Sequence, residues 1–297
     1  MTIRQYILFT IPALIWGSTW YAIKFQLGIV DPLLSVSFRF LLAGLLLITF
    51  CLATGKRMQF SRKEHALMAL LGLSLFGFNY WFVYEVETML TSGVVAVIFS
   101  LIIFFNIFFN AVLLKGSIKK DVVIAAILGV SGTGILFMNE LASFDTEGKN
   151  IVVFLLCMGG IVSASLGNIL SAYKQRKNIP ILQANGFAML YGGLAMFVLV
   201  LILGKPLTFD FSISYTVSLF YLAIFGSIIA FSTYLKLLGE IGPDRAVYIA
   251  LITPAIALLI SSVFEGYNWN FSAFAGIILL FSGNILVLQF KTKKVNR

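Results

Sequence analysis

Residues 32–44, PLLSVSFRFLLAG, and residues 180–192, PILQANGFAMLYG, decide how this chain folds. Each stretch opens on proline, continues as a mostly apolar run and ends on glycine. The two prolines, Pro32 and Pro180, are 148 positions apart, and so are the two glycines, Gly44 and Gly192. Three further pairs of small residues lie 149 to 151 positions apart, namely Gly77 and Gly226, Ala125 and Gly276, and Gly132 and Gly283. The sequence therefore predicts an internal repeat, with one copy in residues 1–145 and the other in residues 146–297.

Each copy contains five long apolar segments. Hydrophobic residues make up 60% of the chain, charged residues 11%, and the mean hydropathy is +1.00, whereas a soluble domain carries about 25% charged residues. Segments of about 17–25 apolar residues can cross a bilayer as helices, and their continuous apolarity does not fit the alternation of barrel strands. The predicted fold is an all-α integral membrane protein with transmembrane helices near residues 6–26, 33–54, 66–84, 91–114, 122–139, 151–172, 180–203, 215–238, 245–264 and 271–290.

Five crossings per copy is an odd number, so the second copy must enter the membrane in the opposite orientation. Inverted repeats of this kind build many secondary transporters. The small residues that fix the register are expected to let helix backbones approach closely, since water does not drive helices together in lipid.

Sorting the charges by loop gives the orientation. With the N-terminus in the cytoplasm and ten crossings, 17 of the 21 basic residues fall on the cytoplasmic side, and only Lys24, Lys149 and Lys205 fall outside. This distribution follows the positive-inside rule, so the net charge of +9 needs no nucleic-acid partner. We expect a protein of the inner (plasma) membrane whose partner is the lipid bilayer and whose two termini are cytoplasmic.

Four motifs, taken in order, resemble the EamA family of the drug/metabolite transporter superfamily. They are residues 16–20 (WGSTW) followed by Lys24, residues 38–40 (FRF) after Pro32, residues 92–94 (SGV) with 99–101 (FSL), and residues 236–246 running on to Thr253-Pro254. The resemblance covers the whole chain. It implies two five-helix bundles around a central cavity and transport of small organic metabolites, which various members export or import.

The chain departs from the family pattern at two places. Ile103 stands where members often carry proline, which removes the usual reason for a kink in the fourth span. The sixth span lacks the tryptophan that many members have near its start and carries instead Ser163, Ser165, Asn168 and Ser171.

Aromatic and polar side chains inside the spans are candidates for the lining of a substrate cavity, because they can stack on or hydrogen-bond a planar or cationic substrate. The residues predicted to line it are Trp16, Thr19, Trp20, Asn79, Tyr80, Ser100, Asn168 and Tyr234. Helix packing or an interfacial aromatic belt is the alternative for each of them.

Four residues are candidates for gating or coupling. Arg39 lies roughly 10 Å inside its span. Burying an arginine in lipid at that depth costs free energy, so its side chain should face protein or water. It could bind substrate, act in gating, or have a structural role. Lys24 ends the first span and could simply snorkel. Glu85 could titrate with coupled protons or lie in a solvated loop, and Pro254 should kink its helix.

These features predict a secondary active transporter of small organic metabolites (amino-acid-like, vitamin or drug-like) that works by alternating access, with helices 1, 3, 4, 6, 8 and 9 around the cavity. Export is slightly favoured; import of a nucleoside-like or vitamin-like metabolite and a passive pore are the alternatives. A membrane enzyme is disfavoured because no catalytic cluster lies within the spans. Cys51 and Cys157 have no metal-ligand spacing, so no metal or cofactor is expected. Substrate, direction, proton coupling and oligomeric state (monomer or homodimer) stay open.

Overall fold

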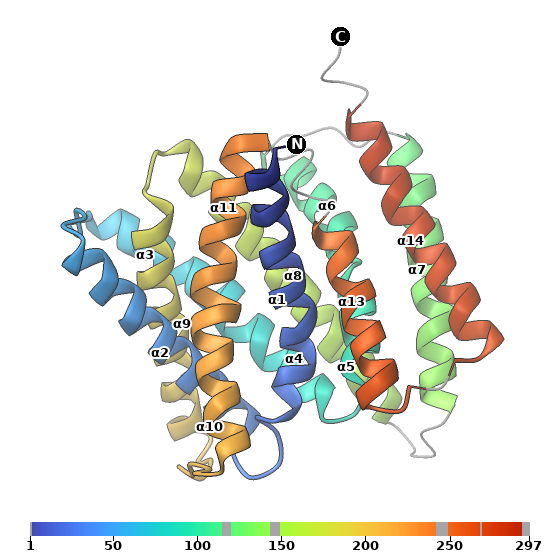
Figure 1. Ribbon diagram of the computed structural model, residues 1–297, viewed down its shortest axis with the longest axis horizontal. Coiled ribbons are helices and arrows are strands. Elements are labelled where there is room, and N and C mark those ends of the chain that lie inside the picture. The colour runs from blue at the N-terminus through green and yellow to red at the C-terminus, as the bar shows by residue number, and fades with distance from the viewer. Residues whose placement is uncertain (1, 115–119, 143–148, 242–248, 268, 293–297) are drawn as a thin grey trace. The chain divides into compact units, whose positions relative to one another are not determined.

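The structure is a computed structural model that describes residues 2–114, 120–142, 149–241, 249–267 and 269–292. Every regular element in these residues is helical, as predicted. The helices are α1 (Ile3–Lys24), α2 (Pro32–Ala53), α3 (Arg62–Leu71), η1 (Gly72–Phe78), α4 (Asn79–Glu87), α5 (Ser92–Phe99), α6 (Ile102–Leu114), α7 (Lys120–Ala142), α8 (Lys149–Arg176), α9 (Ile181–Ile202), α10 (Ile213–Phe220), η2 (Tyr221–Ile229), α11 (Ala230–Ile241), α13 (Ile249–Phe264) and α14 (Phe271–Thr292) (Figure 1).

The all-α membrane fold predicted from the sequence is confirmed. Seven helical segments of the described residues are long and apolar enough to cross a bilayer, and three shorter apolar helices, Val123–Leu136, Ile249–Phe264 and Phe271–Leu286, fall at other predicted spans. Residues 242–248, which hold part of the motif between the eighth and ninth spans, lie outside the described residues.

The third and eighth spans each contain a π-helical segment, which the sequence did not predict. The third span runs α3–η1–α4 and the eighth runs α10–η2–α11. The π segments begin at Gly72 and Tyr221, close to the spacing that the glycines keep. Wider π turns are often found at functional sites because they redirect the side chains that follow them.

The fourth span is interrupted even though it has no proline. The amides of Ser100 and Leu101 bond three residues back, to the carbonyls of Val97 (3.1 Å) and Ile98 (3.1 Å). The Ser100 hydroxyl also donates to the Val97 carbonyl, at 2.7 Å. These tighter turns separate α5 from α6, so a local hydroxyl takes part in a break that proline supplies elsewhere.

Contacts divide the chain into two compact units, each drawn from both halves of the sequence. Unit 1 comprises residues 1–21, 89–157 and 230–297, and unit 2 comprises residues 22–88 and 158–229. The repeat boundary between residues 145 and 146 stays a prediction. Within each unit, helices that the repeat register relates lie against each other: α2 packs on α9 in unit 2, while α7 packs on α14 and α5 on α13 in unit 1 (Figure 1).

Glycines make these pairings possible. In unit 2, a Cβ on Gly44 would lie 2.6 Å from the Leu190 backbone nitrogen, and one on Gly192 would lie 2.6 Å from the Gly72 carbonyl oxygen. In unit 1, a Cβ on Gly283 would lie 2.5 Å from the Ala125 carbonyl oxygen. The packing role expected for these glycines is confirmed.

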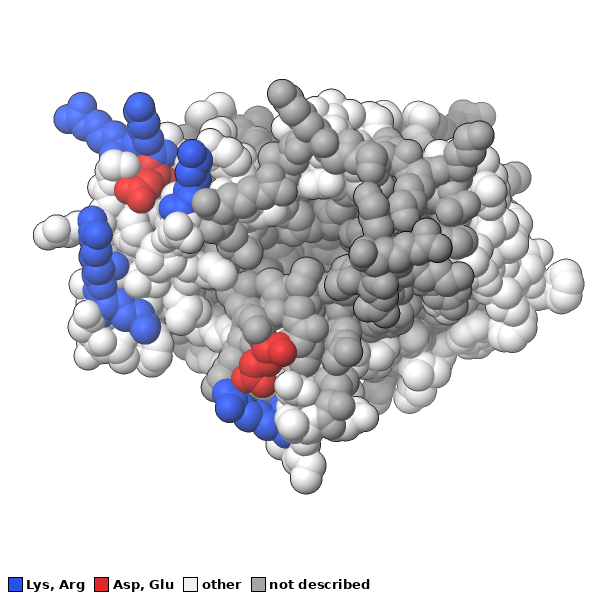
Figure 2. Space-filling model, turned by 90° about the horizontal axis from the view of Figure 1, so that it is seen from above, with Lys and Arg blue, Asp and Glu red and all other residues white. Residues whose placement is uncertain are grey.

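Local signals start the helices of unit 2. Asp31 caps α2, since its carboxylate accepts from the Leu33 amide at 3.0 Å, and Pro32 occupies the first turn. Ser61 and Glu64 form a reciprocal capping box at the start of α3. The loop between α2 and α3 and the first turn of α3 carry four exposed basic residues, Lys56, Arg57, Arg62 and Lys63. Lys and Arg side chains gather at one edge of the face drawn in Figure 2.

Candidate functional site

Arg39 is one of three described charged residues of unit 2 that are 1% exposed, together with Glu87 and Lys174. The Arg39 guanidinium lies 4.5 Å from the ring centre of Tyr80 and 5.1 Å from that of Phe40. Nε donates to the Ser227 hydroxyl at 3.4 Å and Nη1 donates to the Tyr84 hydroxyl at 3.5 Å. The sequence predicted Arg39 and Tyr80 separately, and the structure brings them together.

The π segment η2 supplies one wall of this cluster. The Ser227 hydroxyl donates to the Leu222 carbonyl, five residues back, at 3.0 Å. Its oxygen therefore remains available to accept from Arg39. Because Ser227 belongs to the eighth span and Arg39 to the second, this contact joins the two halves of the sequence inside unit 2.

Lys24 and Glu87 meet near the end of α4. The Lys24 ammonium donates to the Glu87 carbonyl oxygen at 2.5 Å, so the lysine caps the C-terminal carbonyls of another helix, where a cation is favoured. Glu87 is 1% exposed. Lys24 was predicted as a gating candidate, whereas the burial of Glu87 was not foreseen.

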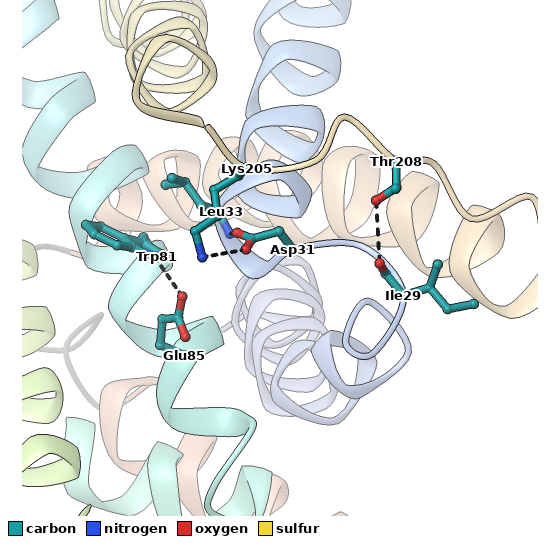
Figure 3. Close-up of polar contacts among 7 residues, drawn as sticks. All are labelled: Ile29, Asp31, Leu33, Trp81, Glu85, Lys205 and Thr208. Carbon is teal, nitrogen blue, oxygen red and sulfur yellow. Dashed lines mark hydrogen bonds and ion pairs between the residues drawn. The ribbon is translucent and has the colours of Figure 1, made fainter. Parts of the chain in front are cut away.

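Glu85 lies in a group of polar contacts with Trp81, Asp31 and Lys205 (Figure 3). The Trp81 indole donates to the Glu85 carboxylate at 2.9 Å, and the Lys205 ammonium lies 2.9 Å from the Asp31 carboxylate. The hydrogen bond to Asp31, its charge and then the charge of Glu85 raise the pKa of Lys205, which lies in the loop before α10. Proton coupling by Glu85 stays a prediction.

A buried polar network near the same end was missed by sequence reasoning. Gln26, 0% exposed, donates to the Tyr215 carbonyl at 2.9 Å and to the Ser218 hydroxyl at 2.7 Å. The hydroxyls of Ser35 and Tyr215 are 3.0 Å apart. This network ties the segment before α2 to α10. The only signal for it was the presence of polar residues at span ends.

In unit 1, the tryptophans of the WGSTW motif pack against aromatic rings. The Trp16 ring lies 5.2 Å from Phe231 and 5.3 Å from Tyr234, and the Trp20 ring lies 5.5 Å from Phe99. Trp16 and Trp20 are both half-buried. The structure thus groups Trp16 with Tyr234, two of the predicted lining residues, in one aromatic cluster.

The other residues of that motif have local roles. The Thr19 hydroxyl donates to the Trp16 carbonyl at 2.9 Å. Gly17 lets α1 approach α13, because a Cβ there would lie 2.5 Å from Ile256 Cγ2. Pro254 is buried inside α13, where it removes the backbone donor for the Ala250 carbonyl.

Polar groups also join spans in unit 1. The Asn284 amide of α14 donates to the Ser100 hydroxyl at 3.1 Å, and both side chains are buried. The Glu265 carboxylate accepts from the Ser92 amide, with oxygens at 3.1 and 3.2 Å, and from the Ser92 hydroxyl, so it caps the start of α5. Ser100 therefore has a structural partner that the sequence did not reveal.

The two asparagines predicted to line the cavity belong to unit 2. Asn79 is 7% exposed, and its amide nitrogen donates to the Leu75 carbonyl at 3.2 Å. Asn168 lies half-buried on α8. The joint lining of one cavity by the predicted residues of both units stays a prediction. The described residues contain no group of three or more potential metal ligands.

A sequence model of the EamA-like transporter family matches residues 3–138 and again residues 151–289. The chain belongs to the EamA-like transporter family. The resemblance deduced from the motifs is thereby confirmed, and the two matches together include all the predicted spans except the last residues of the fifth and the tenth.

Individual relatives agree with the family. The chain is similar to the uncharacterized inner membrane transporter YedA of Escherichia coli (strain K12), at 28% identity over 85% of this chain and 80% of that one. Protein PecM of Dickeya dadantii is 25% identical over 92% of this chain and 88% of its own. A crystal structure of a protein with 18% identity covers 99% of both chains with a TM-score of 0.70, which shows the shared fold.

Family membership and the apolar helices support a membrane transporter, and relatives of the chain are named as inner membrane transporters. The same relatives point away from an enzyme.

Proposed function

We propose that the protein is a secondary active transporter of small organic metabolites in the inner membrane and that it works by alternating access, with export favoured over import. The observation that carries this proposal is the burial of Arg39, at 1% exposure, inside a span of an EamA-like chain. Charges within spans are retained where substrates or ions pass, because burying them in lipid is unfavourable.

Inverted topology and cytoplasmic termini are part of the proposal. In unit 1, α1 begins and α14 ends on the same side (Figure 1), as an even number of crossings requires. In unit 2, the exposed basic residues between α2 and α3 support a cytoplasmic position for the end of α2, which follows the N-terminus by two crossings in the sequence. A second copy that keeps the glycine spacing with an odd number of helices supports the inversion.

The first experiment identifies the substrate. Metabolites inside and outside cells would be compared between a strain that lacks the protein and one that overproduces it. Under the proposal, at least one small organic metabolite accumulates outside the overproducing strain and inside the deletion strain. The opposite pattern would support the import alternative.

The second experiment tests the mechanism with the metabolite so identified. Purified protein in liposomes should show counterflow, that is, uptake of labelled metabolite driven by unlabelled metabolite inside, and the rate should saturate. Flux that rises linearly with concentration and shows no counterflow would indicate a passive pore and exclude alternating access.

A further inference from the structure

The guanidinium of Arg39 retains hydrogen-bond donors that the described residues do not use. Its contacts to Ser227 and Tyr84, at 3.4 and 3.5 Å, are longer than the roughly 2.7–2.9 Å of charge-assisted bonds. Nη2 makes no hydrogen bond within the described part of the chain. No Asp or Glu oxygen of the described residues lies within 4.0 Å of this guanidinium.

Tyr84 offers a second donor at the same place. Its oxygen accepts from Arg39 Nη1, and no acceptor for its own hydroxyl proton is found among the residues that the structure describes. Tyr84 is 0% exposed. Two adjacent donors in largely buried residues are unfavourable when they lack an acceptor, because burial removes most of their contact with water.

Aromatic rings lie against the guanidinium of Arg39, so a ligand would bind at the edge of the guanidinium plane. Tyr80 and Phe40 cover the guanidinium at 4.5 and 5.1 Å. The edge of a guanidinium presents parallel N–H groups whose spacing matches the two oxygens of a carboxylate. We propose that Arg39 and Tyr84 bind the carboxylate group of the transported substrate, an inference that rests on the proposed transport function.

The charge near this site favours a single negative charge on the ligand. Glu87, 1% exposed, lies one helical turn after Tyr84 on α4. A dianionic phosphate would meet stronger repulsion from this carboxylate than a monoanionic carboxylate does. The site therefore selects organic acids or amino acids over phosphorylated metabolites.

Tyr80 controls access to the site. Arg39 is buried, while Tyr80, the ring nearest to its guanidinium, is half-buried. The described conformation is thus closed over Arg39, and rotation of one aromatic side chain removes part of the cover. The predicted lining residue Tyr80 and the predicted gating residue Arg39 then act as one unit.

Binding can be measured without flux, on the purified full-length protein in detergent. The thermal unfolding midpoint would be followed with sodium acetate and sodium benzoate, with acetamide and benzamide as neutral counterparts of the same shape, and with ionic strength balanced by sodium chloride. We expect at least one carboxylate to raise the midpoint with increasing concentration, since a ligand of the native state stabilises it, while its amide does not.

Variants then assign the effect. Arg39→Gln and Tyr84→Phe should each weaken carboxylate binding about tenfold or more, the usual effect of losing a hydrogen bond to a charged group. Tyr84→Phe keeps the ring, so it remains informative if Arg39→Gln does not fold. The control is Arg62→Gln, which removes an exposed arginine and should leave binding unchanged.

Three outcomes would overturn the inference: no carboxylate shifts the midpoint, each amide acts as strongly as its acid, or the shift survives in Tyr84→Phe and Arg39→Gln alike. A chloride effect as large as that of the carboxylates would overturn the assignment to a substrate carboxylate. These outcomes say nothing against transport, which the counterflow assay tests separately, and absent counterflow would leave a measured carboxylate site standing.

Discussion

Replacing Gly132 by alanine would place a methyl group inside the contact between α7 and α14. The new Cβ would lie 2.5 Å from the Gly276 carbonyl oxygen and 2.5 Å from the Leu280 backbone nitrogen. Both are backbone atoms, so no side-chain rotation can relieve the clash. Ordinary contacts begin at 3.4 Å, so the two helices must separate locally by about 0.9 Å.

Gly134 provides a matched control on the same helix, because a Cβ there meets nothing within 4 Å. Both substitutions bring the same gain in helix propensity, about 1 kcal/mol. The difference in the free energy of unfolding between the two variants therefore measures the cost of overpacking alone. That cost should be about 1–3 kcal/mol, with Gly134→Ala the more stable variant. Gly132→Ala should unfold at a lower temperature than Gly134→Ala, and Gly134→Ala at or above the wild-type temperature.

The native cysteines provide the assay. Cys51 and Cys157 are both buried, so a maleimide fluorophore reacts with them as the protein unfolds. Cys157 belongs to unit 1, together with α7 and α14. In a Cys51→Ala background, the fluorescence then reports the opening of that unit. Equal midpoints for the two glycine variants, or a lower midpoint for Gly134→Ala, would refute the proposed close contact.

Three further predictions concern separate parts of the molecule. Lys205→Met should reduce the free energy of unfolding by the same small amount at pH 7 and pH 9, about 0–1 kcal/mol for an exposed ion pair. Because Asp31 raises the pKa of Lys205 above the usual lysine value of about 10.4, the difference should shrink as the pH rises from that usual value through the higher folded value. A difference already lost at pH 9 would contradict this prediction. Ser100→Ala and Asn284→Ala should each lower the free energy of unfolding by about 0.5–2 kcal/mol. In a double-mutant cycle, the double variant should lose less stability than the sum of the two single losses, because the two side chains share a hydrogen bond. Strictly additive losses would argue against that bond. Trp16→Ala should change the transport rate with little loss of folded protein while Trp269→Ala, an exposed control, should not, and unchanged flux in Trp16→Ala would make Trp16 a packing residue.

Apolar length and small-residue spacing were enough to predict the helices and the role of the glycines. Segment length decides whether a helix spans lipid, and a glycine at repeat-related positions has few uses besides close packing. Gly44, Gly132, Gly192 and Gly283 all meet the backbone of another helix. These properties are local, so they can be read from sequence without knowing which helices are neighbours.

The features that sequence reasoning missed depend on long-range contacts or on backbone geometry. Gln26 and Tyr215 are 189 residues apart, and neither polar residue stands out within its own segment. The π segment η1 reads as an ordinary apolar helix containing two glycines. The interruption at Ser100 comes from bonds to Val97 that any serine can form. Glu87, which lies two residues after the predicted Glu85, is the more buried of the two because α4 turns it inward.

The second copy of the repeat keeps the packing glycines of the first copy but has no counterpart of the Arg39 charge. This difference affects how many carboxylate sites one chain can form. The position 148 residues after Arg39 is Phe187, an uncharged neighbour of Ala188 and Met189. Its ring lies 4.9 Å from that of His65 and 5.8 Å from that of Phe60, and His65 Nδ1 lies 2.9 Å from the Tyr191 hydroxyl. Among the described residues, the ring contacts of Phe187 are with Phe60, His65 and Tyr191, and none of the cation–ring contacts of an arginine involves it. Because both positions lie in unit 2, we expect one carboxylate site in that unit and not two. Under the proposal, recognition depends on Arg39 and Tyr84 of the first half of the sequence, and Ser227 is the contribution of the second half.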